Sequence, residues 1–312
     1  MLWLATCCRI VLCHSVKLQV TGANAGTLAS FPAIDASKAA TVLNQCATPG
    51  MFAITLDDGP AVNTAAALAA LKEKNAVATF FVNGHNQVDL NTDTAAQARL
   101  KDIYAAGHQV GSHTYTHADL ASLSVDAIWT EMQSNDDLIF SLIGVRPIHV
   151  RLPFLSGNQQ VYDALGSWGY RIAGVNLDTR DFEHSGGPTE LADNMANFNT
   201  AMDLKHPSYI ALNHDFTAQI GPWISQMVDA VRARGFKLVT IHECLGDADA
   251  YRNAVKQPPA PTTNPTPAEK QQPKLDPTQN ARNSSSNGKL VKNGSQQLVV
   301  SSTLVAFFTM II

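Results

Sequence analysis

The sequence lacks the excess of positive charge that marks nucleic-acid-binding proteins. Its 22 Lys and Arg residues are outnumbered by 26 Asp and Glu residues, so the formal net charge is -4 at pH 7. The sequence has no excess of Lys and Arg that could neutralise a phosphate backbone, so we expect no nucleic-acid partner. The Gly-rich loops that hold nucleotide phosphates are absent as well. A neutral or weakly charged partner fits this composition better.

Cysteine is scarce, and its distribution is informative. Three of the five cysteines lie in the apolar N-terminal stretch at residues 2–13, which leaves Cys46 and Cys244 almost 200 residues apart. If the N-terminal stretch is removed, a pair that flanks the folded region indicates a disulfide formed in an oxidising compartment. Two buried free thiols are the alternative.

Residues 1–25 are interpreted as a signal peptide, although the pattern is imperfect. Arg9 interrupts the apolar run, and the small-x-small sequence Ala23-Asn24-Ala25 lies far downstream of it. Cleavage after Ser15 is the alternative. Both versions place the mature protein outside the cell.

The C-terminal region lacks a run long enough to cross a bilayer comfortably. Residues 253–297 are rich in Pro, Thr, Asn, Gln and Ser, and we interpret them as a disordered stalk. The apolar tail at 298–312 follows a polar spacer and the small residues 284–288. This order is typical of a GPI-anchor signal, with Ser286 as the preferred attachment site. A tail-anchored helix or an aggregation-prone coil are the alternatives. The GPI interpretation predicts a protein held at the plasma membrane or cell wall.

Between these ends, short apolar runs alternate with helical patterns, which predicts an α/β fold made of parallel βαβ units. About seven units favour a barrel with its chemistry at the carboxyl ends of the strands, and an open doubly wound sheet is the alternative. The expected strands are residues 52–56, 77–82, 109–112, 149–152, 171–177, 209–212 and 237–241, and the expected helices include 63–74, 95–105, 125–142 and 223–234.

The first polar group at a strand end is Asp57-Asp58-Gly59-Pro60. Adjacent strand residues point to opposite faces, but Gly59-Pro60 breaks the strand at once, so both carboxylates could turn into one site. Two neighbouring carboxylates repel each other unless positive charge lies beside them, and a metal ion would supply it. Taken alone, this sequence is a common turn.

The second group contains His113 and His117, four residues apart. We expect this pair to lie on one face of a helical turn, where it could share a metal with Asp58. Two imidazoles and one carboxylate leave coordination positions open for water and substrate. Such a ligand set is typical of a catalytic site and not of a structural one.

Three further groups also follow predicted strands. They are Arg151-Leu152-Pro153-Phe154, Asp178-Thr179-Arg180-Asp181-Phe182 and Leu212-Asn213-His214-Asp215. Arg151 is either a surface charge or the partner of a carboxylate in the site. A histidine that faces a carboxylate at another strand end is a common arrangement for orienting and charging an imidazole.

In this order, the five groups resemble the five motifs of the polysaccharide deacetylase family, which includes fungal chitin deacetylases. The resemblance covers roughly residues 46–252, the predicted catalytic domain. It implies a distorted, often incomplete (β/α) barrel. It also implies that Asp57 is the general base and that Asp58, His113 and His117 hold a divalent metal, usually zinc, with Co²⁺ as the alternative.

The resemblance implies roles for the other strand-end residues as well. Arg151 positions Asp57, and the backbone N–H of Phe154 joins the metal in stabilising the oxyanion. Asp181 orients His214, the general acid, and Leu212 lines the pocket for the acetyl methyl group. The implied reaction removes N-acetyl groups from N-acetylglucosamine residues of chitin or its oligomers, and we expect a monomer.

Three positions depart from the family pattern. Leu56 stands where Phe is usual, Phe182 stands where Trp is usual, and Leu155-Ser156-Gly157-Asn158 replaces a tight Gly turn. These departures bear on the shape of the substrate site. Two other functions stay open at this point: an acetylxylan esterase of the same family, and an inactive cell-wall glycan-binding protein.

Overall fold

The computed structural model of the protein describes residues 32–252. The predicted signal peptide, the stalk at 253–297, the apolar tail and Ser286 all lie outside the described residues. Within residues 32–252, no helix is long and apolar enough to cross a membrane.

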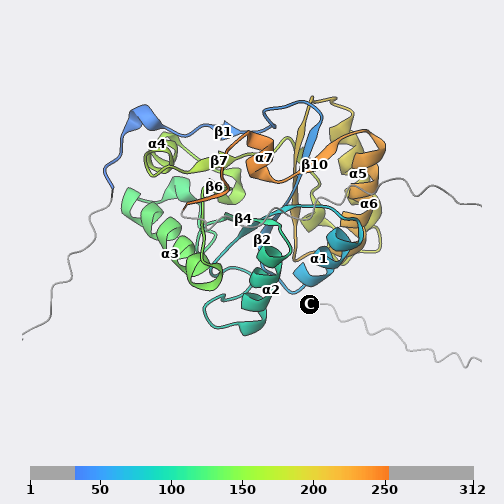
Figure 1. The fold of residues 1–312 in the computed structure, drawn as a ribbon, viewed down its shortest axis with the longest axis horizontal. Helices are drawn as coiled ribbons and strands as arrows, with labels where there is room; N and C mark the ends of the chain where they lie inside the picture. The colour runs from blue at the N-terminus through green and yellow to red at the C-terminus, as the bar shows by residue number, and fades with distance from the viewer. Residues whose placement is uncertain (1–31, 253–312) are drawn as a thin grey trace, which may run out of the picture. The chain divides into compact units, whose positions relative to one another are not determined.

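One curled sheet of nine parallel strands forms the centre of the described chain (Figure 1). Its order is β1-β7-β6-β4-β3-β2-β9-β8, and β10 pairs with the beginning of β2. These strands are β1 Val42–Leu43, β2 Met51–Gly59, β3 Thr79–Val82, β4 Gln109–Ser112, β6 His149–Val150, β7 Arg171–Ala173, β8 Leu177–Asp178, β9 Tyr209–His214 and β10 Lys237–Val239. Two short strands, β5 Arg146–Pro147 and β11 Tyr251–Arg252, pair separately and antiparallel.

The strand order is that of an incomplete barrel. From β2 the strands follow chain order through β3, β4 and β6 to β7, and the chain returns to the other edge of β2 through β8 and β9. A doubly wound sheet would reverse direction in the middle of the sheet, so the barrel prediction is confirmed. The barrel is open between β7 and β8, because β1 takes the free edge of β7.

The single strand expected at residues 171–177 is wrong, because this segment contributes two strands on opposite sides of the opening. Gly174 follows β7 at a point where a Cβ atom would lie 1.9 Å from the side-chain oxygen of Asn44, so β1 approaches the chain closely here. Asn176 then accepts a hydrogen bond from the Ile210 N–H at 2.8 Å and attaches the segment to β9.

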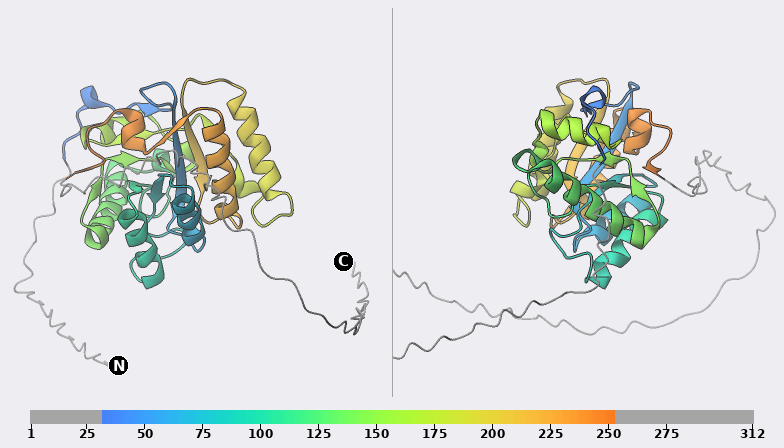
Figure 2. Two further views of the ribbon diagram at one scale, coloured as in Figure 1. Left: turned by 45° about the vertical axis from the view of Figure 1, so that its right-hand side comes forward. Right: turned by 90° about the vertical axis from the view of Figure 1, so that its left-hand side faces the viewer.

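Helices cover the outer face of the sheet, and α5 and α6 lie side by side there (Figure 2). Side chains of Asp93, Ser124 and Asn158 accept hydrogen bonds at the starts of α2, α3 and α4. The predicted strand 237–241 runs too far. Thr240 and Glu243 form a capping box that starts α7 at Ile241. The helices are α1 Thr64–Glu73, α2 Thr94–Ala105, α3 Val125–Ile143, α4 Gln159–Ser167, α5 Glu190–Met202, α6 Ile220–Ala233 and α7 Ile241–Leu245.

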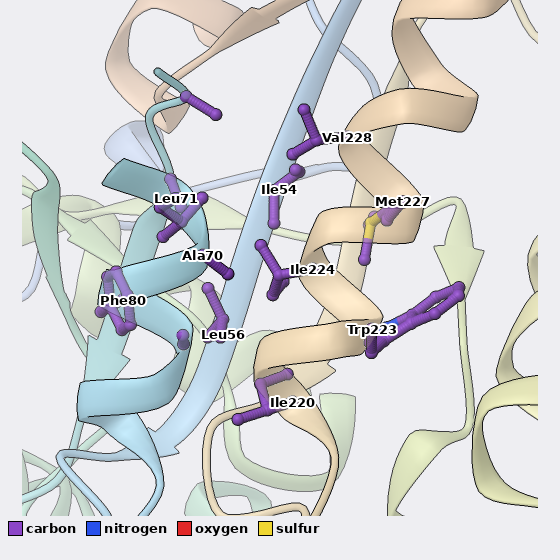
Figure 3. Packing of buried hydrophobic residues seen from close by; sticks show 14 of the residues in the cluster. Ile54, Leu56, Ala70, Leu71, Phe80, Ile220, Trp223, Ile224, Met227 and Val228 are labelled. Atoms are coloured by element: carbon purple, nitrogen blue, oxygen red, sulfur yellow. The ribbon is translucent and has the colours of Figure 1, made fainter. Parts of the chain in front are cut away.

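Strand β2 shows how the sequence separates core from site. Its even-numbered residues from Phe52 to Leu56 are fully buried in the core under α1 and α6, where Ile54 and Leu56 pack near Ile224 (Figure 3). The odd-numbered residues point to the other face, because side chains alternate along a strand. Thr55 and Asp57 therefore enter the interior of the barrel.

The amino ends of the strands are closed by α7. Four polar residues that begin consecutive strands, Thr79, Gln109, His149 and Arg171, form what we call the amino-end row. Thr79 and Gln109 accept hydrogen bonds from the first two N–H groups of α7, both at 2.9 Å. Gln109 lies 3.0 Å from His149 Nδ1, and both His149 and Arg171 reach Asp247 just after α7.

A disulfide joins Cys46, which precedes β2, to Cys244 in α7, with the two Cα atoms 4.4 Å apart. Both residues are buried in a small apolar cluster with Ala53, Phe81 and Ile241. The disulfide and the amino-end row thus fasten the same helix to the same end of the barrel.

Candidate active site

The two acidic residues of the first motif reach one cleft by a local change of backbone. Asp57 is buried and points into the barrel as strand alternation requires. Asp58 has a left-handed backbone with φ 70°, and the register between β2 and β3 shifts between Asp57 and Gly59. This bulge cancels the alternation and turns Asp58 toward the same cleft. Leu56, which departs from the family pattern, faces the helices and does not reach the cleft.

Arg151 is a buried partner of Asp57 and not a surface charge. Its Nη1 lies 3.1 Å from Asp57 Oδ2, and its remaining N–H groups reach the carbonyl oxygens of Ala173 and Gly174 at 2.6 and 3.1 Å. Burial raises the pKa of Asp57, while the charges of Arg151 and His214 oppose that rise. The carboxyl end of β7 therefore holds Arg151, and Arg151 fixes the position of the Asp57 carboxylate.

Asp58, His113 and His117 form a compact group. Their ligand-type atoms all lie within 4.8 Å of one another, and Asp58 Oδ1 is 3.5 Å from His113 Nε2 and 3.2 Å from His117 Nε2. The predicted helical turn for the two histidines is wrong. Residues 113–117 form an irregular turn in which Thr114 and His117 have φ 67° and 60°. These left-handed residues fold the chain back and bring the two rings within 4.8 Å.

The protonation state of His113 indicates that the group formed by Asp58, His113 and His117 is suited to binding a cation. Burial lowers the pKa of His113 to about 3, so its imidazole is neutral and has one N–H. Nδ1 lies 2.7 Å from the Arg151 carbonyl oxygen, which can only accept, so the proton is on Nδ1. The bare lone pair of Nε2 then faces the carboxylate of Asp58. Two facing acceptors need a positive centre between them, and carboxylate with imidazole is a common donor set for a divalent metal.

Asn86 is a neighbour of this group that the sequence did not single out. Its Nδ2 donates to Asp58 Oδ1 at 3.0 Å and to Asn83 Oδ1 at 3.2 Å. The loop that carries Asn86 follows β3, so its position after a strand end is the sequence signal that could have identified it. A hydrogen bond of this kind fixes the orientation of a ligating carboxylate.

His214 and Asp181 form the other side of the site. His214 Nδ1 lies 2.8 Å from Asp181 Oδ1, and the His214 backbone N–H donates to the other carboxylate oxygen at 2.8 Å. Burial lowers the pKa of His214, but its hydrogen bond to Asp181 and the charges of Asp181, Asp57 and Asp58 outweigh burial and raise the pKa to about 9. His214 therefore has a proton to donate at neutral pH. It pairs in register with Asp57 on the neighbouring strand.

A cleft of about 310 Å³ joins these groups. Its apolar walls contain Leu212, which is almost fully buried, and the rings of Phe154 and Phe182, which are 70% and 47% exposed. Phe154 packs edge-on against His117, and Phe182 packs edge-on against His214. The two exposed rings therefore flank the site on its metal-binding side and its acid side. The remaining wall residues are Leu152, Leu155, Asp178 and Phe216.

Backbone strain is concentrated around this cleft. Eight described non-Gly residues have positive φ, and six of them lie within the strand-end motifs or directly after one. Left-handed conformations cost free energy in residues that have a Cβ atom, and they persist where the surrounding structure imposes them. The six residues are Asp58, Thr114, His117, Phe154, Leu155 and Arg180.

The sequence and the fold both match known polysaccharide deacetylases. The model of the family described as polysaccharide deacetylase matches residues 44–173. A chitin deacetylase of Colletotrichum lindemuthianum is 38% identical over 214 residues, which are 67% of this chain and 84% of that protein. A chitin deacetylase of Pestalotiopsis sp is 36% identical over 211 residues, 67% of this chain and 68% of that protein.

The chain belongs to the polysaccharide deacetylase family.

A solved structure supports the same assignment. The structure of the chitin deacetylase from Colletotrichum lindemuthianum superposes with a TM-score of 0.66 at 35% identity, covering 69% of this chain and 96% of that one. As a polysaccharide deacetylase, the protein is a hydrolase that acts on amide bonds. Its Asp58, His113 and His117 form the group that could hold a metal ion.

Proposed function

We propose that this polysaccharide deacetylase hydrolyses the N-acetyl groups of N-acetylglucosamine residues in chitin, yielding chitosan and acetate. One observation carries the proposal: a candidate metal group, a buried carboxylate paired with arginine, and a protonated histidine line one cleft. The relatives named chitin deacetylase support chitin as the substrate.

The metal, which we propose to be zinc with Co²⁺ as the alternative, would be held by Asp58, His113 and His117. When bound, it would supply Lewis acidity that polarises the acetamide carbonyl and acidifies water. The neutral state of His113 and its Nδ1 hydrogen bond leave Nε2 ready to bind a cation. Asn86 holds the Asp58 carboxylate in orientation.

Asp57 acts in the proposal as the general base that takes the proton of the attacking water. Burial raises its pKa, which increases its strength as a proton acceptor. Arg151 opposes this rise but keeps the carboxylate in place through a contact to each oxygen, at 3.3 and 3.1 Å. The hydroxyl of Thr55 lies 3.3 Å from Nη1 and supports the same arginine.

His214 acts as the general acid. An amine is a poor leaving group unless it is protonated as the carbon–nitrogen bond breaks, so the cleft needs a proton donor in addition to the base. Asp181 fixes Nδ1 and leaves Nε2–H free to donate. The exposed ring of Phe182 packs against this imidazole and forms one wall of the cleft.

The remaining predicted residues would serve the acetyl group. We propose that the Phe154 backbone N–H helps to stabilise the tetrahedral oxyanion, for which one good donor is typically worth about 3–4 kcal/mol. Leu212 would contact the acetyl methyl group, since it lines the cleft beside His214.

Acetate release from chitin oligomers and from acetylated xylan, with and without a chelator, tests the proposal. We expect release from chitin oligomers that stops when the metal is removed and returns when zinc is added. Faster release from acetylated xylan would favour an esterase instead. Binding of glycan with no release from either substrate would favour an inactive glycan-binding protein.

The location of the enzyme belongs to the same proposal. We propose that it is secreted and held at the plasma membrane or cell wall through a GPI anchor attached at Ser286, as a monomer. Phosphatidylinositol-specific phospholipase should release it from membranes, or it should be recovered attached to wall glucan. Recovery of membrane protein that still contains residues 298–312 would contradict the anchor.

A further inference from the structure

Asp215 is a fully buried carboxyl group for which the proposed mechanism has no use. It follows His214 at the end of β9 and packs under the end of β2. A Cβ atom on Gly59 would lie only 2.1 Å from Asp215 Oδ2, so the carboxyl group lies directly against the Gly59 backbone. Its own backbone N–H points to the Asp57 carbonyl oxygen at 3.5 Å. Asp215 therefore connects the strand end that carries the proposed base with the one that carries the proposed acid.

The hydroxyl group of Thr64 contacts two oxygen atoms, and its single hydrogen bears on the protonation state of Asp215. Thr64 Oγ1 lies 2.9 Å from the Ala61 carbonyl oxygen and 2.5 Å from Asp215 Oδ2. A hydroxyl group has one hydrogen, whereas a carbonyl oxygen and an ionised carboxylate oxygen are both acceptors only. With Asp215 ionised, one of the two contacts would be a close approach of lone pairs. With Asp215 protonated, both are hydrogen bonds.

The surroundings of Asp215 favour the same state. Its Oδ1 is buried, and no atom of residues 32–252 makes a hydrogen bond with it. Among the same residues, the only other donor to Oδ2 is the Ala61 N–H, at 3.5 Å. Burial raises the pKa of Asp215 to about 7, against the opposing effects of Thr64 and Ala61. The neighbouring charges are those of Asp58, which raises the pKa, and of His214, which lowers it. An ionised carboxylate with an unpaired buried oxygen would be costly here.

We propose that Asp215 is a positioning residue that works as a neutral acid, donating to Thr64, which in turn donates to the Ala61 carbonyl oxygen. This chain of two hydrogen bonds clamps residues 59–64, the turn directly after Asp57 and Asp58, onto the end of β9. Because Asp57 and His214 are paired neighbours on β2 and β9, the clamp sets the distance between them. Its effect on turnover rests on the proposed deacetylase function, whereas the protonation state of Asp215 does not.

The protonation state is tested without any activity measurement. An infrared difference spectrum between the full protein and its Asp215→Asn variant at pH 5 should contain the carbonyl band of a protonated carboxylic acid. Absence of that band would overturn the proposal.

Thermal melting at two pH values gives a second test of the same state. A carboxyl whose folded-state pKa lies above its unfolded value of about 3.9 contributes stability at low pH that is lost as pH rises through the folded pKa. The melting temperature of Asp215→Asn relative to wild type should therefore be higher at pH 8 than at pH 5. A difference that stays constant or falls with pH would count against a neutral Asp215.

The positioning role is tested at Thr64. Thr64→Val keeps the shape of the side chain and removes the hydroxyl, so we expect kcat for acetate release to fall about 10–100-fold with KM and metal content unchanged. Thr64→Ser should restore most of the loss. Thr200→Val removes a similar hydroxyl on α5, which donates to the Ala196 carbonyl oxygen away from the cleft, and should leave kcat unchanged.

The outcomes at Thr64 separate the two proposals. Equal kcat in Thr64→Val and wild type would overturn the clamp. A wild-type protein that releases no acetate would instead overturn the proposed function, and the spectra and melting curves would still decide the state of Asp215.

Discussion

The two ends of the same strands are built in different ways. At their amino ends, β3, β4, β6 and β7 begin with the amino-end row, whose polar atoms are paired with α7 and Asp247. At their carboxyl ends, the same strands and their neighbours lead into turns with left-handed residues, a bare imidazole lone pair and a buried carboxylate.

The barrel gains stability at its amino end and gives some of it up at its carboxyl end. Hydrogen bonds between buried partners and a disulfide hold the amino end, while the carboxyl end collects strain and like-charged groups that become useful only in catalysis. We therefore expect changes at the two ends to affect different measurements.

The largest effect should come from exchanging Asp57 and Asp58 for asparagine one at a time. Asp57→Asn should keep its metal and lose about 10²–10⁴-fold in turnover, because only proton removal is lost. Asp58→Asn should lose metal affinity, and excess zinc should partly restore its activity. Elemental analysis paired with acetate release measures both. The opposite pattern of metal loss would exchange the two roles, and two active variants would place the site elsewhere.

At the amino end, the double variant Cys46→Ala with Cys244→Ala should affect stability and not chemistry. Removal of a native disulfide typically costs about 2–5 kcal/mol in the free energy of unfolding. Denaturant unfolding measures that loss, and kcat at a temperature where the variant stays folded should match wild type. A large fall in kcat of the folded variant would contradict the separation of the two ends.

At the carboxyl end, turnover should depend on pH through His214. Since the pKa of His214 is raised to about 9, its proton should be available below that pH and turnover should fall as pH rises through it. The same proton favours folding, so its stability contribution is present below about 6.5 and is lost as pH rises toward 9. Asp181→Asn should move the alkaline fall in turnover about one to three pH units lower. A pH–rate profile identical to wild type would remove His214 from the acid role.

The smallest effect is expected for Gln109→Leu in the amino-end row. This change removes the acceptor of the His242 N–H and the neighbour of His149 Nδ1, both at the amino end of the barrel. Leaving a buried polar group unpaired costs about 1–3 kcal/mol. Thermal or denaturant unfolding measures the loss, while kcat should stay unchanged. A loss of activity at full stability would show that the amino end also supports the site.

Much of the site could be predicted because strand ends meet at one edge of a parallel barrel. That rule brought together Asp57, His113, Arg151 and His214 from sequence positions that span more than half of the chain. It could not supply the left-handed backbone at His117, because the surrounding packing and not the local sequence selects that conformation. His149 belongs to none of the five motifs, so the sequence assigned it no role. The structure shows that it is a buried member of the amino-end row.

Other parts of the fold depend on long-range contacts that a periodic pattern does not contain. The separation of β7 from β8 follows from the hydrogen bond between Asn176 and β9. Strand β1 lies before residue 46, where the predicted catalytic domain begins, and it belongs to the sheet because it pairs with β7. The neutral state of Asp215 likewise depends on Gly59 and Thr64, which are about 150 residues away along the chain.

The disulfide between Cys46 and Cys244 makes a covalent ring of the catalytic region. The two cysteines are 198 positions apart, and every residue proposed for catalysis or metal binding lies between them. A protease that cuts one exposed loop inside this ring therefore yields no free fragment. The nicked protein should migrate as one band without reductant and as two with it. An enzyme that works among secreted proteases would stay in one piece through such a cut.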